Sequence, residues 1–134
     1  MTGSGPTKPI PDGAKELTAH LQDSLGNRLR SVIWYDKGDH DVLYARSDVA
    51  AAYTEAEIED VVDELSMESF ARPIKEDLYP HGDLRCTVEC YEDGVEMHFC
   101  IADGEGVAVG IEPTAFVEEG TFIGNCLEAA ELVE

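Results

Sequence analysis

Apolar side chains recur at helical spacing near the start of the chain. Leu17, Leu21 and Leu25 lie four residues apart on one helical face, and Gly26 follows where a helix cap would form. This pattern predicts a helix over residues 14–25.

The next apolar residues have the composition of a β-hairpin. Residues 29–35 (LRSVIWY) are rich in β-branched and aromatic side chains, residues 41–46 (DVLYAR) resemble them, and Gly38 lies in the DKGDH segment between. Because Trp34 and Tyr35 are neighbours, both faces of the first strand carry large side chains. Such a strand is either covered on both sides by its own domain or buries one face against a partner.

A second helix begins with a capping signal. The Thr54 hydroxyl can accept from the amide three residues later, where Glu57 can reach back. The helix then shows apolar residues at a spacing of three to four: Ile58, Val61, Val62 and Leu65. Pro73 should end or kink this helix, and residues 74–79 can form a further turn.

The second half of the chain alternates apolar and polar residues in three segments separated by turns at 92–94 and 103–106. This period of two predicts an antiparallel meander with one buried face. The expected inward residues are Leu84, Cys86, Val88, Cys90, Val95, Met97, Phe99, Ile101, Val107, Val109 and Ile111. Pro113 interrupts the pattern, and residues 121–133 then read as a final helix.

The elements therefore follow the order α-β-β-α-β-β-β-α, which predicts an α+β sandwich with a five-stranded antiparallel sheet. To bury a continuous apolar face, the hairpin and the meander must join edge to edge. At 134 residues the chain fits one domain. We expect a flexible lead over residues 1–13 and a single domain over residues 14–134.

Charge is the strongest compositional signal. Asp and Glu total 29 and Lys and Arg total 9, so the net charge is −20. Self-repulsion of this size opposes compaction in dilute buffer, whereas molar salt shortens the Debye length to about 3 Å. The composition predicts a protein of an extreme halophile; the alternatives are an acidic protein of an ordinary organism and one that binds a basic partner.

The same charge argues against binding to nucleic acids and to anionic membranes, both of which need a cationic surface. No apolar run approaches the ~18 residues of a membrane span, and the N-terminal residues lack the pattern of a secretion signal. We therefore expect a cytoplasmic protein.

Residues capable of catalysis or metal binding do not form a recognisable set. The cysteines follow the spacing C-x3-C-x9-C-x25-C, unlike paired zinc ligands, and the four histidines fall on different elements. The segment GEGVAVG at 104–110 leads into a strand and not into the helix that a phosphate-binding loop requires. We expect no metal, no cofactor and no catalytic site, with the cysteines as free thiols in the core.

Aromatic residues on the hairpin are the remaining candidates for function. Trp34, Tyr35 and Tyr44 form a candidate interaction surface, since aromatic side chains are favoured interface anchors. The leading hypothesis is a non-catalytic module that forms a homodimer or binds another protein. The alternative is a small-molecule sensor with its ligand between sheet and helices; an apolar cavity lined by Met97, Phe99 or Tyr79 would favour it.

Two resemblances accompany these expectations. The element order resembles the profilin-like topology of roadblock and longin domains. The segments YDKGDHDVLYARSDV, EDLYPHGDL followed by CTVECYEDGVEMHF, and FIGNCLEAA look like a family of short, uncharacterised haloarchaeal proteins over about residues 28–128. The second resemblance implies a halophilic origin and supplies no activity or catalytic residue.

Overall fold

The computed structural model describes residues 8–118, 121, 125–126 and 129–130. Its helices are α1 (Asp12–Leu25), α2 (Ser47–Ala52), α3 (Glu55–Phe70), α4 (Arg72–Leu78) and α5 (Thr114–Glu118), with a single 3-10 turn, η1, at Gly26–Arg28. Its strands are β1 (Leu29–Asp36), β2 (Asp39–Ala45), β3 (Cys86–Cys90), β4 (Val95–Ala102) and β5 (Glu105–Ile111).

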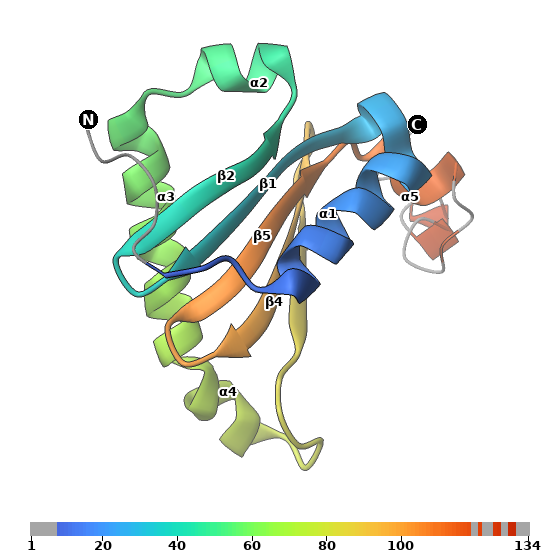
Figure 1. Cartoon of the computed structure of the whole chain (residues 1–134). Coiled ribbons are helices and arrows are strands. Elements are labelled where there is room, and N and C mark those ends of the chain that lie inside the picture. The colour runs from blue at the N-terminus through green and yellow to red at the C-terminus, as the bar shows by residue number, and fades with distance from the viewer. Residues whose placement is uncertain (1–7, 119–120, 122–124, 127–128, 131–134) are drawn as a thin grey trace.

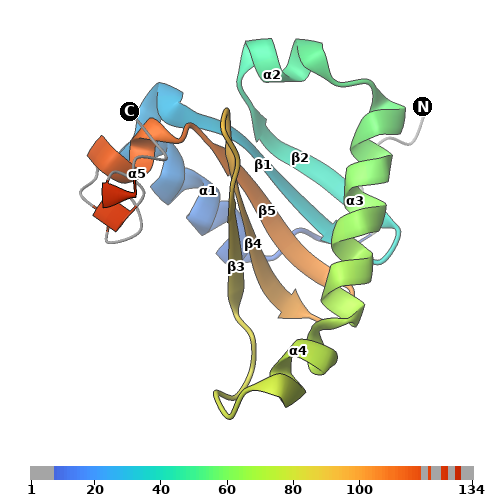
Figure 2. The same ribbon diagram turned by 180° about the vertical axis from the view of Figure 1, so that it is seen from behind.

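The five strands form one antiparallel sheet in the order β2-β1-β5-β4-β3. The hairpin joins the meander through the pairing of β1 with β5, as the burial argument required. The α+β class and the five-stranded antiparallel sheet are therefore confirmed. Figure 1 shows α1 lying across one face of this sheet, and Figure 2 shows α3 on the opposite face.

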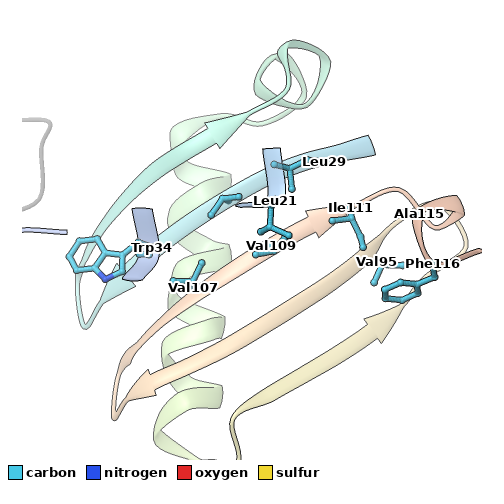
Figure 3. Close-up of a cluster of buried hydrophobic side chains, with 11 residues drawn as sticks. Leu21, Leu29, Trp34, Val95, Val107, Val109, Ile111, Ala115 and Phe116 are labelled. Carbon is cyan, nitrogen blue, oxygen red and sulfur yellow. The ribbon is translucent and has the colours of Figure 1, made fainter. Parts of the chain in front are cut away.

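The main core lies between α1 and the sheet. Large apolar side chains from β1, β4 and β5 point toward α1 and α5, with Trp34 at one end and Phe116 at the other (Figure 3). Among them Val32, Trp34, Val95 and Val109 have no exposed surface. Burial of this set removes apolar area from water and holds α1 to the sheet.

The opposite face of the sheet is also covered, so the expectation of a single buried face is wrong. Tyr35 and His98 point away from the α1 core and are buried beneath α3. On this second face Gly106, Ala108, Gly110 and His98 are buried, whereas Glu96 is exposed.

In the edge strand β3, residues that were expected to be buried are exposed. Val88 and Cys90 were expected inside, yet both are exposed, and Ile101 at the end of β4 is exposed as well. These positions lie at the margin of the sheet, beyond the part that the α1 core covers.

Helix boundaries agree with the capping signals. Thr54 Oγ1 accepts from the Glu57 amide at 3.1 Å, and Glu57 Oε1 accepts from the Thr54 amide at 2.8 Å, which confirms the capping box. Pro73 lies in the first turn of α4, so α3 ends and a new helix begins there.

Three features differ from the expected elements. Helix α2 and helix α5 were not predicted, and α1 begins at Asp12, two residues before the expected domain boundary. The hairpin turn contains only Lys37 and Gly38. Most of the predicted helix over residues 121–133 lies outside the described residues.

Candidate functional site

A cavity of about 720 Å³ lies between the sheet and the helices α2 and α3. Its apolar lining comes from Ile33 of β1, Val42 of β2, Val49 of α2, Val61 of α3 and Ala108 of β5. A volume of this order is typical of small-molecule sites, which combine apolar walls with a few polar groups. We call this space the sheet groove.

The central strand β5 explains why the groove exists. Its residues Val107, Val109 and Ile111 point into the α1 core, while Gly106, Ala108 and Gly110 point to the face beneath α3. Since successive side chains of a strand alternate between faces, one face is filled and the other is left shallow. Glycine inside a strand often marks a place that another group must approach closely.

Polar atoms lie close above both glycines. A Cβ atom at Gly106 would lie 2.6 Å from the backbone carbonyl oxygen of Phe99, 2.7 Å from Tyr35 Oη and 3.1 Å from His98 Nε2. A Cβ at Gly110 would lie 2.9 Å from Ser31 Oγ and 3.2 Å from Glu96 Oε2. The glycines thus allow side chains of β1 and β4 to approach one another across β5.

Tyr35 and His98 form a buried pair at the floor of the groove. Tyr35 Oη lies 2.5 Å from His98 Nε2 and donates to the Leu65 carbonyl oxygen of α3 at 3.2 Å. Burial raises the pKa of Tyr35 and lowers the pKa of His98, so both groups are neutral near pH 7.

One tautomer of the His98 ring makes both contacts hydrogen bonds. A neutral phenol has one proton, so in this tautomer Tyr35 donates to Leu65 while His98 Nε2–H donates to Tyr35 Oη. His98 Nδ1 is then an acceptor, and Glu68 Oε2 lies 3.6 Å from it, beyond hydrogen-bond range.

A second polar contact holds the C-terminal half of α3 to the sheet. Ser69 is fully buried; its hydroxyl donates to the Ala102 carbonyl at 3.0 Å and accepts from the Gly104 amide at 2.9 Å. Earlier in α3 only Val62 is buried, and Ile58, Val61 and Leu65 line the groove instead. The helix is therefore fixed at one end and forms the wall of an open space at the other.

Helix α2 is positioned by a cluster of ion pairs at the rim. Arg46 contacts Asp48 at 2.6 Å and Glu112 at 3.2 Å, and Glu112 also binds Arg30 at 3.0 Å. These contacts tie the start of α2 to the ends of β1 and β5. They also occupy the Arg30 guanidinium, the one basic side chain among the residues that line the groove.

Carboxylates dominate the charge of the groove. Five of them line it: Asp60, Glu64, Glu68, Glu89 and Glu96. Glu96 keeps contact with solvent, yet partial burial raises its pKa to about 6, the Arg30 charge lowers it and Glu89 raises it further. Burial also raises the pKa of Glu68, with Glu89 and Glu64 adding to the effect.

The predicted interaction residues, Trp34, Tyr35 and Tyr44, do not line the sheet groove. Trp34 and Tyr35 have no exposed surface, so neither can touch a partner in this conformation, and α1 and α3 cover their strand from opposite sides. Tyr44 is half-buried and packs against the α1 core. Tyr35 instead supports the floor of the groove through His98.

The cysteines form no site with one another. Cys86, Cys90, Cys100 and Cys126 are all free thiols, and Cys90 and Cys126 are exposed, contrary to the expected core location. Burial raises the pKa of Cys86, Cys90 and Cys100, which disfavours the nucleophilic thiolate. In the described ranges no group of three or more His, Cys, Asp or Glu side chains is arranged to hold a metal ion.

The groove residues were not recognised in the sequence, apart from Met97, named as a possible cavity wall. His98 alternates with apolar residues in β4, as a solvent-facing residue would, yet it is buried, whereas Glu96 is exposed. The Gly-x-Ala-x-Gly spacing of β5, in which small residues alternate with Val, was the available signal.

The fold and site together define an α+β domain whose antiparallel sheet has one packed face and one grooved face. The chain belongs to the family described as Domain of unknown function (DUF7522), whose model matches residues 15–131. No curated protein matches the chain significantly. Among the described helices, none has both the length and the apolar character needed to cross a bilayer.

Because the pKa of Glu96 is raised, replacing its carboxylate with a neutral group should stabilise the fold to an extent that depends on pH. Folding raises this pKa from 4.5 to about 6, so the ionised side chain destabilises the fold above pH 6 and the effect vanishes below about pH 4.5. After allowance for solvent contact, Glu96→Gln should raise the free energy of unfolding by about 1 kcal/mol near neutral pH. Urea unfolding at several pH values measures this.

Glu92→Gln, in the exposed turn before β4, removes the same charge outside the groove and is the control. An equal gain from both variants, or a gain for Glu96→Gln that persists at about pH 4, would show that net charge and not the groove is responsible.

Proposed function

We propose that this protein is a non-catalytic domain that binds a small molecule in the sheet groove. The observation that carries the proposal is the cavity of about 720 Å³ with apolar walls and a polar floor. Of Met97, Phe99 and Tyr79, the possible cavity walls, only Met97 borders this cavity, and its side chain packs against the α1 core. The cavity favours the sensor hypothesis over the interaction module that the hairpin aromatics suggested.

Retention of destabilising features supports this proposal. Gly106 and Gly110 weaken the central strand, and Glu96 is held at a raised pKa. Natural proteins retain such features mainly where function requires them, and perturbed pKa values cluster at functional sites. The acidic and thiol groups on this face lack the paired nucleophile and base of a covalent enzyme, which supports a binding role.

Filling the groove should abolish binding without unfolding the domain. Ala108 points from β5 into the groove, so Ala108→Leu occupies part of the cavity. Titration with the neutral dye Nile red should give saturable fluorescence with one site on the wild-type chain, weakened at least about tenfold by the variant. Circular dichroism confirms that the variant is folded.

Val88→Leu adds a side-chain carbon on the exposed edge strand and is the control. It should leave the dye affinity unchanged. Absence of saturable binding to the wild-type chain, or equal binding by Ala108→Leu, would contradict the proposal.

Self-association is a second candidate function, supported by a separate surface. Met67 and Phe70 at the end of α3 and Ile74 and Leu78 in α4 follow one another at intervals of three or four residues. Each is more than half exposed, at 67%, 54%, 69% and 69%. Large apolar side chains are favourably removed from water, and a second copy of the chain could cover these four on this patch.

A charge placed on this patch should separate the copies. Ile74→Glu should convert a dimer to a monomer in size-exclusion chromatography with light scattering, because burial of the new carboxylate is unfavourable. Gln22→Glu, on the exposed side of α1, adds the same charge elsewhere and should leave the dimer intact. A wild-type chain that is monomeric at all concentrations would rule this candidate out.

The net charge of −20 supports operation in concentrated salt. Screening should stabilise the fold, so we expect the melting temperature to rise by roughly 10 °C between dilute buffer and about 2 M KCl. Differential scanning calorimetry measures the change, and sucrose at equal osmolarity controls for solvent exclusion. An unchanged melting temperature in KCl would remove the support for a halophilic origin.

A further inference from the structure

We infer that the ligand of the sheet groove is a protonated organic amine with an apolar body. The inference rests on the proposed binding function and specifies its ligand class. It follows from three properties of the groove: the sign of its charge, the hydrogen-bonding state of its floor and the apolar character of its walls.

The charge of the groove selects a cation. Five carboxylates line the space, and the one guanidinium among the lining residues, that of Arg30, is already bound to Glu112 at 3.0 Å. An anionic ligand would therefore meet a surplus of like charge. Lys75 of α4 offsets part of it, because its charge acts on both Glu68 and His98. Glu68 is half-buried, whereas Asp60, Glu64, Glu89 and Glu96 are exposed, so salt screens a charge pair with Glu68 less than one with the other four.

The floor selects a cation that carries N–H donors. His98 is only 6% exposed, and its Nδ1 atom is a lone-pair acceptor in the tautomer that makes both Tyr35 contacts hydrogen bonds. Glu68 Oε2 lies 3.6 Å from this atom, so two acceptors converge at one place with no proton between them. An ammonium group can donate to both, whereas a quaternary ammonium has no hydrogen to donate.

The apolar walls of the groove favour a ligand whose remaining part is apolar. Ile33, Val42, Val49, Val61 and Leu65 surround the space from the sheet and both helices. Burial of an aromatic or aliphatic body against them adds affinity in proportion to the apolar area removed from water. A small inorganic cation would leave these walls uncovered, and the groove is much larger than such an ion.

Calorimetric titration with matched probes tests the inference. Phenethylamine, which is protonated at neutral pH, should bind at least about tenfold more tightly than phenethyl alcohol or phenylpropionate, because only the amine supplies charge-assisted donors. The phenethyltrimethylammonium ion should bind more weakly than phenethylamine, since it lacks N–H groups.

A substitution and a pH series locate the charge pair. Glu68→Gln should weaken phenethylamine binding about tenfold and leave phenethyl alcohol unchanged, whereas Glu92→Gln should affect neither. Acidification from about pH 7.5 to about pH 5 protonates Glu96, whose pKa is about 6, and the raised pKa of Glu68 acts in the same direction, so amine binding should weaken about tenfold. Arg30 lowers and Glu89 raises the pKa of Glu96. Glu89 and Glu64 raise the pKa of Glu68, whereas Lys75 of α4 lowers the pKa of both Glu68 and His98.

The outcomes separate this inference from the proposed function. Equal binding of the alcohol or the acid, or absence of amine binding while Nile red still saturates, overturns the amine and leaves the groove as a ligand site. Failure of both the amine and Nile red overturns the two together. Amine binding that Glu68→Gln leaves intact overturns the location of the charge pair and with it the inference.

Discussion

Large and small side chains alternate along β5, and this alternation determines how each face of the sheet is packed. Val107, Val109 and Ile111 fill the face beneath α1, while Gly106, Ala108 and Gly110 leave the other face shallow. β5 lies between β1 and β4, so the size of its side chains limits how closely a helix or a ligand can approach each face of the sheet. Here one face becomes a packed core and the other admits buried polar groups and a cavity.

The groove depends on how α3 is attached as much as on what lies beneath it. Hydrogen bonds from Tyr35 to Leu65 and from Ser69 to Ala102 hold the helix at its C-terminal half. Buried hydrogen bonds have directional geometry, unlike apolar contacts, so they fix the spacing of helix and sheet without filling the space between them. The carboxylates of α3 are thereby presented to the groove and not only to bulk water.

Periodicity and capping predicted most of the fold, because both act locally. The capping box at Thr54, the helix boundary at Pro73 and the strand alternation each arise within a few residues. The site could not be predicted in the same way: His98 and Glu96 resemble solvent-facing strand residues until α3 is placed above them. Trp34 and Tyr35 are buried because α1 and α3 cover opposite faces of the sheet. The sequence left open whether the second face is covered by the domain itself or by a partner.

We propose that small molecules bind on the grooved face of the sheet, beneath α2 and α3. Backbone amide NMR shifts recorded during titration with phenethylamine would locate the bound molecule residue by residue. Binding in the sheet groove predicts saturable shifts at Ile33, His98 and Ala108 and in α3, with little change along α1. Shifts concentrated on α1 or on the exposed α4 surface, or none that saturate, would contradict it.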